Sequence, residues 1–288
     1  MILVTGATGH IGSELVRLLA EAGTPARALI HTPDKAAPIE RLGLETAVGD
    51  FEQPDTLDAA MAGCDHLFLL SPPSPRQTEQ ERNVIDAAKR AGVEHVVKQS
   101  VPWAAPDAGF VFCRWHGQIE QHLERSGLAH TLLRPSNFMQ NFLMSAQLVA
   151  DQGVLYGMTG EGRVGFIDTR DIAAAAATLL ANPGHQGTSY TLTGPEALSA
   201  AEVAERLSAA SGRQVRYVDV GPNAFRQGLR DAGLPGWLVD GVVEGNTLLA
   251  AGHGAAVTDE VARLTGRPPR TFAQFAADHR LAFGGQPS

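Results

Sequence analysis

The chain has 288 residues, of which 44% are hydrophobic and 19% charged, as in ordinary globular proteins. The formal net charge of -8 argues against a nucleic-acid or anionic-membrane partner, because neither attracts an acidic protein. Cys64 and Cys113 are too few for a disulfide framework, which favours a reducing cytoplasm. No apolar stretch approaches the roughly 20 residues of a membrane-spanning helix, so we expect neither export nor membrane insertion.

Short apolar runs alternate with helical patterns in the first half of the chain. Strands are expected at residues 2–5, 26–30, 44–48, 66–70, 95–99 and 131–133, and helices at 12–22, 54–61, 77–91 and 114–126. Continuous apolar strands are typical of a parallel sheet that is covered on both faces. Repeated βα units of this length predict an α/β fold with a doubly wound parallel sheet of the Rossmann type.

The alternation ends after residue 135. Four glycines, at positions 153, 157, 160 and 162, indicate turns before a strand at 164–167 and a helix from Thr169. Later strands are expected at 189–193 and 214–218, and the capping-box pattern from Ser199 to Glu202 opens a helix to about residue 211. We therefore expect a cofactor-binding domain over 1–150 and a smaller α/β substrate-binding lobe over 151–288, with some elements of the lobe returning to the first domain.

A glycine-rich turn joins the first strand to the first helix. Gly6 lets the chain turn, Gly9 lets the backbone approach a pyrophosphate, and Gly12 lets helix and sheet pack closely. The spacing G-x-x-G-x-x-G between a strand and a helix predicts dinucleotide binding. The expected contact residues of this turn are Gly6, Thr8, Gly9, His10, Ile11 and Gly12.

The end of the second strand decides which dinucleotide is preferred. NAD enzymes usually carry an acidic residue there for the ribose 2′-hydroxyl, but here the strand runs into His31 and Thr32, with Lys35 close behind. These side chains suit a 2′-phosphate, so the sequence favours NADPH over NADH. The alternative is that Lys35 belongs only to the solvated start of a helix.

Other strand ends add candidate contacts, because open α/β sheets bind ligands at the carboxyl ends of their strands. Asp50 either accepts from the adenine amino group or caps a turn. The further candidates for cofactor contact at these ends are Phe51, Leu70, Ser71, Pro72, Gln99 and Ser100.

Several segments together resemble the NmrA-like, atypical short-chain dehydrogenase/reductase family. They are residues 4–12, 48–50, 87–93, 126–128, 133–141, 257–259 and 264–269, which span nearly the whole chain. The resemblance implies a Rossmann domain with a small α/β substrate lobe and NADP binding. It also implies one of two activities, since the family contains both reductases and redox-sensing regulators that bind a dinucleotide without turnover.

The usual acid of short-chain dehydrogenases is missing. Their Tyr-x-x-x-Lys pair protonates the carbonyl oxygen as hydride arrives. The lysines here are at positions 35, 89 and 98 and the tyrosines at 156, 190 and 217, so no such pair exists. Aligning the chain with the family puts Phe112 at the tyrosine position and His116 at the lysine position.

Two residues are candidates to replace that acid. His116 either holds the nicotinamide ribose, donates a proton near neutral pH, or is a helix-packing histidine bonded to Glu120. Ser100 either orients a carbonyl or satisfies a strand-end backbone group. Further cofactor contacts are expected from Pro135, Asn137 and Phe138, although Asn137 and Phe138 could instead serve as a helix N-cap and core packing. An aromatic-walled substrate pocket is expected from Trp103, Trp115, Phe138 and Asn141, and the alternative for the rings is ordinary core packing.

The sequence therefore predicts an NADPH-dependent oxidoreductase that reduces a quinone or an aromatic, polyketide-like ketone. Without the tyrosine, protonation is expected to be assisted by the substrate. The alternative is a redox-sensing regulator that acts through a protein partner. No motif for a metal, an acyl transfer or a nucleotide-hydrolysis loop is present, and a monomer or homodimer is expected.

Overall fold

The computed structural model describes residues 1–182 and 184–286 and divides into two compact units. The first unit holds residues 1–135 and 170–191, and the second holds 136–169 and the chain from 192 onward. The chain leaves the first unit at Pro135, earlier than the expected boundary at 150. The reason is that Ala146 and Val149 are buried in the same hydrophobic core as Leu155, within the second unit.

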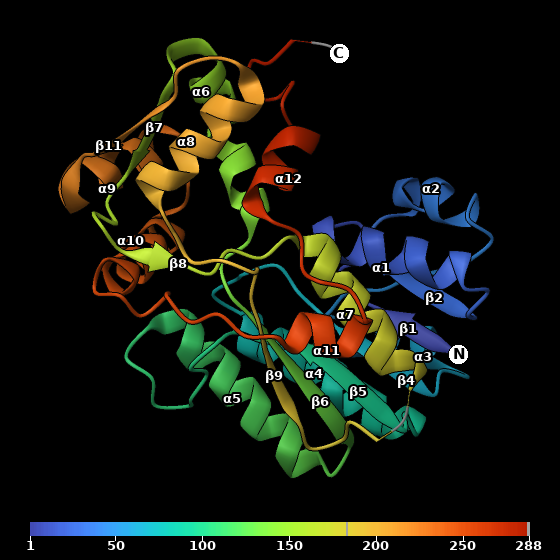
Figure 1. Cartoon of the computed structure of the whole chain (residues 1–288). Coiled ribbons are helices and arrows are strands. Elements are labelled where there is room, and N and C mark those ends of the chain that lie inside the picture. The colour runs from blue at the N-terminus through green and yellow to red at the C-terminus, as the bar shows by residue number, and fades with distance from the viewer. Residues whose placement is uncertain (183, 287–288) are drawn as a thin grey trace. The chain divides into compact units, whose positions relative to one another are not determined.

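A seven-stranded sheet with the order β3-β2-β1-β4-β5-β6-β9 forms the centre of the first unit (Figure 1). The register pairs are parallel from β3 through β6. The strands are β1 (Ile2–Val4), β2 (Ala26–Ile30), β3 (Glu45–Val48), β4 (His66–Leu69), β5 (His95–Gln99), β6 (Ala129–Pro135) and β9 (Ser189–Leu192). The predicted α/β fold with a doubly wound parallel sheet is confirmed.

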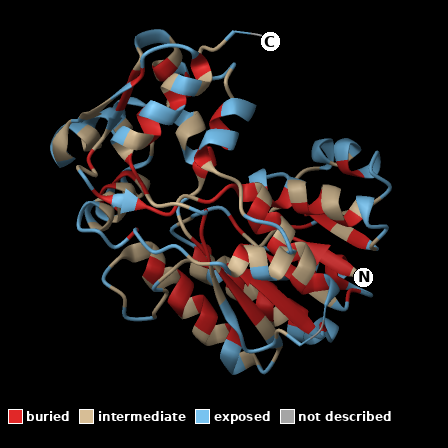
Figure 2. Ribbon diagram, in the orientation of Figure 1, coloured by how far each residue is buried: buried red, intermediate tan, exposed pale blue. Residues whose placement is uncertain are grey.

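Helices cover both faces of this sheet. Buried residues of α3 (Pro54–Met61), α4 (Gln77–Ala91) and α5 (Val111–Ser126) share one core with the strands. Helices α1 (His10–Glu21) and α7 (Thr169–Ala181) lie on the other face (Figure 1). Short turns η1 (Pro33–Lys35) and α2 (Ala37–Glu40) follow β2. The central strands are buried almost throughout, as their continuous apolar sequences require (Figure 2).

A glycine follows each of the helices α4 and α5. Gly92 after α4 and Gly127 after α5 have φ values of 75° and 79°, in the left-handed region that glycine adopts without steric cost. Gly92 and Gly127 are the C-caps of these helices. They fix where the chain turns back toward β5 and β6.

The second unit contains two small sheets. β7 (Val154–Gly157) pairs in parallel with β11 (Arg216–Asp219), and β8 (Arg163–Val164) pairs antiparallel with β10 (Leu198–Ser199). The predicted strand at 164–167 is wrong in extent, because Phe166 N bonds back to Val164 O and ends the strand. The helices of this unit are η2 (Met139–Ser145), α6 (Ala146–Gln152), α8 (Ala200–Ser211), α9 (Gly221–Asp231), α10 (Gly236–Ala250), α11 (Glu260–Thr265) and α12 (Phe272–Asp278).

Aromatic side chains make up much of the core of the second unit. Phe272 contacts the rings of Phe142, Phe166 and Phe275, with ring centroids 5.2 to 6.1 Å apart. The capping box predicted at Ser199 and Glu202 is present at the start of α8.

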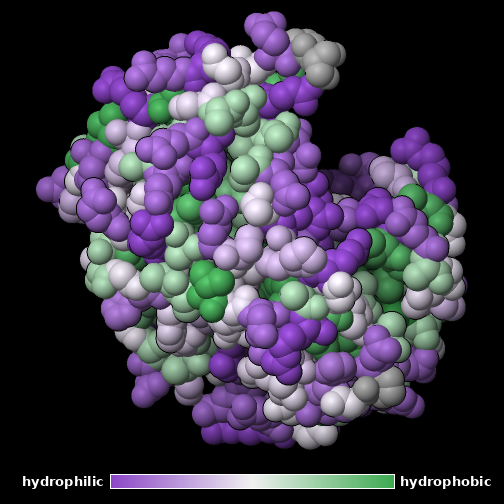
Figure 3. All heavy atoms as spheres, viewed as in Figure 1, coloured by the Kyte–Doolittle hydropathy of each residue, from purple (hydrophilic) through white to green (hydrophobic). Residues whose placement is uncertain are grey.

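Hydrophilic residues cover most of the face drawn in Figure 3, and hydrophobic residues are interspersed among them. Within the described residues, none of the helices combines the length and the apolar character needed to cross a bilayer.

Candidate functional site

The glycine turn after β1 has the shape of an anion cradle. Gly6 has a φ of 62°, and a Cβ there would lie 3.0 Å from Leu70 Cγ. A Cβ on Gly12 would lie 2.1 Å from the carbonyl oxygen of Gly6, so a side chain at either position would fill the turn. Thr5 ties the turn to Leu70, the residue after β4. Its hydroxyl donates to Leu70 O at 2.8 Å and accepts from Leu70 N at 2.8 Å.

The start of α1 leaves its backbone donors available. Gly9 is the N-cap and supplies no side-chain hydrogen bond, and the first turn carries no acidic residue. Thr8, Gly9 and His10 are exposed. Uncapped N–H groups at a helix start attract anions, and the nearby glycines leave room for one. These residues fit the pyrophosphate of a dinucleotide, while Ile11 is buried and packs in the core.

The residues expected to choose between NADPH and NADH lie at the end of β2. His31 and Lys35 are exposed and Thr32 is half-buried. Lys35 lies in η1, a short turn after the strand, and its side chain forms no ion pair with the described residues. His31 and Lys35 are thus two exposed basic side chains, and Asp34 is the acidic residue of this turn. Such a pair suits a phosphate group.

Asp50 caps the turn that leads to α3. Its carboxylate accepts from Glu52 N at 2.9 Å and from Gln53 Nε2 at 3.1 Å. The sequence left open whether Asp50 binds the adenine amino group or caps a turn, and the structure contains the turn-capping contacts. Phe51 packs partly buried against the core of the first unit.

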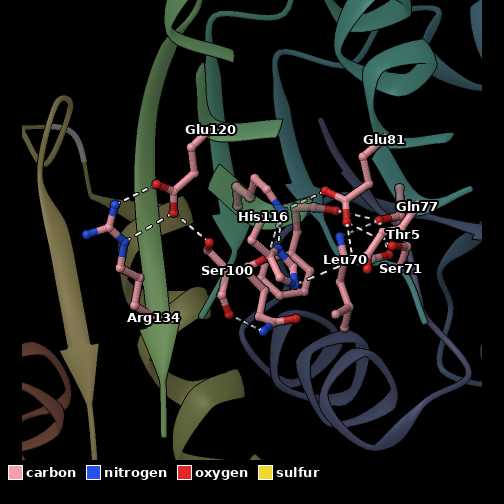
Figure 4. Close-up of polar contacts among 12 residues, drawn as sticks. Thr5, Leu70, Ser71, Gln77, Glu81, Ser100, His116, Glu120 and Arg134 are labelled. Carbon is pink, nitrogen blue, oxygen red and sulfur yellow. Dashed lines mark hydrogen bonds and ion pairs between the residues drawn. The ribbon is translucent and has the colours of Figure 1, made fainter. Parts of the chain in front are cut away.

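A buried ion pair joins β5 to α4, and its acidic member Glu81 is labelled in Figure 4. Lys98 on β5 and Glu81 on α4 have no exposed side-chain surface, and Lys98 Nζ lies 2.6 Å from Glu81 Oε2. Lys98 also donates to Gln99 O at 2.9 Å. Buried charges are expensive unless they are paired and hydrogen-bonded, and both conditions hold here.

Glu81 also connects to β4 and to its own helix. Its Oε1 accepts from Ser71 Oγ at 2.8 Å and from Gln77 Nε2 at 3.0 Å. Ser71 follows β4 and is buried, and Gln77 lies one helical turn before Glu81 on the same face of α4. The predicted cofactor contact Ser71 is thus part of this network, whereas its neighbour Pro72 is exposed.

His116 on α5 lies in the middle of these groups (Figure 4). Its Nδ1 is 3.3 Å from Lys98 Nζ and its Nε2 is 3.5 Å from Gln77 Nε2. Burial, together with the Lys98 ammonium, lowers the pKa of His116 well below its ordinary value. The lowered pKa disfavours the imidazolium, so proton donation by His116 near neutral pH gains no support from this geometry. Its expected bond to Glu120 is also replaced by these contacts.

Ser100 and Glu120 form a second buried group with Arg134. Ser100 Oγ donates to Glu120 Oε1 at 2.5 Å, and Arg134 Nη2 donates to Glu120 Oε2 at 2.5 Å. Ser100 has no exposed surface. The only hydroxyl hydrogen of Ser100 is thus used by Glu120, and neither a strand-end backbone group nor a ligand receives it in this arrangement. Its neighbour Gln99 is buried and donates to Ser100 O at 2.5 Å.

Sequence reasoning missed Lys98, Glu81 and Gln77. A signal for Lys98 was present, because a lysine inside a strand expected to be buried on both faces requires a buried partner. Glu81 lies on α4 among the buried residues Val84, Ile85 and Ala88, where a charged side chain is out of pattern.

The loop between β5 and α5 carries Trp103. Trp103 has a φ of 56° and is 58% exposed. The loop is tied to α5, since Cys113 Sγ lies 3.3 Å from Pro102 O and Ala105 N donates to Cys113 O at 3.2 Å. A Cβ on Gly117 would lie 2.1 Å from the carbonyl carbon of Ala105, so helix and loop are in close contact.

Trp115 and Phe112 lie on α5 with tilted rings whose centroids are 5.5 Å apart. Phe112, at the position of the missing tyrosine, also contacts the ring of Phe110 at 5.3 Å. The side chains of Phe112 and Trp115 are half-buried. This end of α5 therefore carries aromatic rings and no phenolic acid.

The remaining candidates lie at or after the end of β6. Pro135 is buried at the end of the strand. Asn137, Phe138 and Asn141 belong to the second unit, where Phe138 forms an isolated bridge with Ile167. Asn137 and Asn141 are exposed, and Phe138 is half-buried.

Known proteins resemble this chain over its whole length. It is 46% identical over 284 residues to an NAD(P)H azoreductase of Xenophilus azovorans, covering 99% of both chains. It is 37% identical to a (4-alkanoyl-5-oxo-2,5-dihydrofuran-3-yl)methyl phosphate reductase of Streptomyces griseus, covering 98% of this chain and 99% of that protein.

A crystal structure of an NADPH-dependent quinone oxidoreductase from Escherichia coli, complexed with NADPH, has a similar fold. The TM-score is 0.89 at 30% identity, covering 96% of this chain and 99% of that one. Residues 1–244 match the NmrA-like family. With the dinucleotide cradle and the doubly wound sheet already described, these matches show that the chain belongs to the NmrA-like family.

Proposed function

We propose that this protein is an NADPH-dependent oxidoreductase that reduces flat aromatic acceptors, with quinones as the leading class. The observation that carries the proposal is the glycine turn before the uncapped start of α1. The names of the relatives, an azoreductase and a quinone oxidoreductase, support the same reaction class.

The chain's own residues bind NADPH at two places. Gly6, Gly9 and Gly12 receive the pyrophosphate at the start of α1. His31 and Lys35, both exposed, pair with the 2′-phosphate and favour NADPH over NADH. When bound, NADPH supplies the hydride.

The proton must come from somewhere other than an acidic side chain of this site. His116 is neutral and Ser100 donates to Glu120, so neither acts as the acid. A quinone that gains one hydride and one proton becomes a quinol, and its second oxygen can take the proton from water. An aromatic ketone with a neighbouring phenol supplies its own proton. Acceptors of these two kinds need only orientation from the protein.

Trp103 and Trp115 are the proposed aromatic contacts of the first unit. An exposed indole on a loop tied to the helix beside it offers a fixed surface for stacking a planar acceptor. Flat aromatic acceptors are therefore favoured over small aliphatic ketones.

The test is the loss of NADPH absorbance with a panel of quinones, azo compounds and aryl ketones. Turnover with quinones and a preference for NADPH over NADH are expected. Tight NADPH binding without turnover by any acceptor would contradict the proposal and favour a redox-sensing regulator. A pull-down with and without cofactor would then test that function, because a sensor binds its partner differently in the two states.

A further inference from the structure

The hydrogen bonds of Lys98 define which nitrogen of His116 carries its hydrogen. An ammonium has three hydrogens and no lone pair. Lys98 Nζ has three neighbours, namely Glu81 Oε2 at 2.6 Å, Gln99 O at 2.9 Å and His116 Nδ1 at 3.3 Å. His116 Nδ1 must therefore be the nitrogen with the lone pair, because a hydrogen there would point at a cation.

The hydrogen of the neutral ring is then on Nε2. The neighbour of Nε2 is the amide nitrogen of Gln77 at 3.5 Å, which already donates to Glu81 Oε1 at 3.0 Å. An amide nitrogen cannot accept a hydrogen bond. The two nitrogens face each other as donors, and the described contacts give His116 Nε2–H no acceptor.

The amide of Gln77 is held in this orientation by Glu81. Turning the amide over would place its oxygen against the Glu81 carboxylate, which already accepts from Ser71 and Lys98. Three elements thus fix the arrangement, because Glu81 lies on α4, Lys98 on β5 and His116 on α5. Figure 4 labels Glu81 and His116.

We infer that Lys98, anchored by Glu81, is a positioning residue that holds His116 as the Nε2–H tautomer, so that Nε2–H donates to an uncharged hydroxyl or carbonyl oxygen of a bound ligand. The ligand contact in this inference rests on the proposed function, whereas the tautomer follows from the contacts of Lys98 alone. A buried donor without an acceptor is costly, and an oxygen placed between His116 and Gln77 removes that cost.

The tautomer is measured directly by nitrogen NMR of the ¹⁵N-histidine-labelled protein without cofactor, with His116→Gln identifying the signals. At neutral pH we expect the Nδ1 of His116 to give the signal of an unprotonated ring nitrogen and Nε2 that of a protonated one. The opposite pattern, or an imidazolium, overturns the inference whether or not the protein is an enzyme.

The role of Lys98 is tested with the double variant Lys98→Met, Glu81→Gln, which removes both buried charges and keeps similar side-chain volumes. We expect a mixture of both tautomers and a several-fold weaker binding of NADP⁺. The matched control is Arg90→Met, Asp58→Asn, which removes an exposed ion pair between α4 and α3 and leaves the His116 signals unchanged.

An unchanged Nε2–H tautomer in the folded double variant would overturn the role of Lys98. If the double variant does not fold, the wild-type measurement still decides the tautomer. A second arm adds NADP⁺ to the wild type, and a shift of the Nε2–H proton signal is expected. Turnover without any such shift would overturn the ligand contact while leaving the proposed reaction intact.

Discussion

Gly12 faces the carbonyl group of Gly6 so closely that no side chain fits between them, with a Cβ on Gly12 only 2.1 Å from Gly6 O. Since backbone atoms stand in the way, Gly12→Ala must displace the turn. We expect at least tenfold weaker NADPH binding and a loss of about 1–3 kcal/mol in the free energy of unfolding. Fluorescence titration with NADPH and urea unfolding measure the two effects.

The matched control is Gly228→Ala in α9, where a Cβ meets nothing within 4 Å. There the same substitution should stabilise the protein by about 0.5–1 kcal/mol, because alanine favours a helix more than glycine does. Equal NADPH affinity in wild type and Gly12→Ala would contradict the assignment of the turn.

Lys35 is expected to discriminate between the two dinucleotides. Lys35→Ala should raise the KM for NADPH about three- to tenfold and leave the KM for NADH unchanged, because only NADPH carries the 2′-phosphate. The difference should shrink at high salt, since Lys35 is exposed. Lys89→Ala on α4, also an exposed lysine, is the control. A parallel change in both KM values would argue against the contact.

Trp103 has a backbone conformation that favours glycine. Trp103→Gly removes a cost of about 1–2 kcal/mol for a left-handed conformation, at a residue that is 58% exposed. We expect unchanged or slightly higher stability but about a tenfold higher KM for aromatic acceptors. The KM for NADPH should not change, and Trp103→Phe should restore most of the acceptor binding. Normal acceptor kinetics in Trp103→Gly would remove this residue from the substrate site.

His95 makes the stability of the fold sensitive to acid. Burial is the main cause that lowers its pKa to about 4, and His66, His130 and His185 add to the effect. Between pH 6.5 and 4 the unfolded chain binds a proton that the native protein does not, so stability falls as the pH falls. Above pH 6.5 this contribution is fully present.

His95→Gln, which retains a polar group near Thr131, should reduce the slope of unfolding free energy against pH in that range by about 1.4 kcal/mol per pH unit. Urea unfolding at several pH values gives the slope. His116 also has a lowered pKa and keeps part of the dependence in the variant. Identical slopes for wild type and variant would show that the pKa of His95 is the same in the folded and the unfolded protein.

Ser100 is predicted to matter for structure more than for chemistry. Ser100→Ala removes one donor from the buried Glu120 carboxylate, which keeps its two contacts with Arg134. We expect a loss of about 1–2 kcal/mol in stability with a kcat within about twofold of wild type. A hundredfold loss of kcat in a folded Ser100→Ala variant would restore the catalytic role that its place at the strand end first indicated.

The sequence predicted the strands and the cradle well because both depend on local pattern. β2 and β5 begin and end at the predicted residues, and the three glycines take the expected places. The buried ion pair was not predictable in the same way. Lys98 and Glu81 are 17 residues apart and lie on different elements, so only their packing brings them together.

Ser100 and His116 show the same limit. Their positions at a strand end and on α5 followed from the pattern, but their partners did not. Glu120 was expected to bond His116 one turn away on the helix and instead accepts from Ser100, 20 residues earlier on the neighbouring strand end. Contacts across elements decide the chemistry of a side chain, and spacing along one helix does not.

Of the lysines, Lys98 is sealed in the interior and only Lys35 and Lys89 are exposed. Amine-directed reagents therefore reach two side chains and the chain's amino terminus. One of those side chains, Lys35, is proposed to pair with the cofactor, so NADPH should shield it from acylation while Lys89 reacts freely. Surface attachment through amines, carried out with NADPH present, would then use Lys89 on α4 or the amino terminus and spare Lys35.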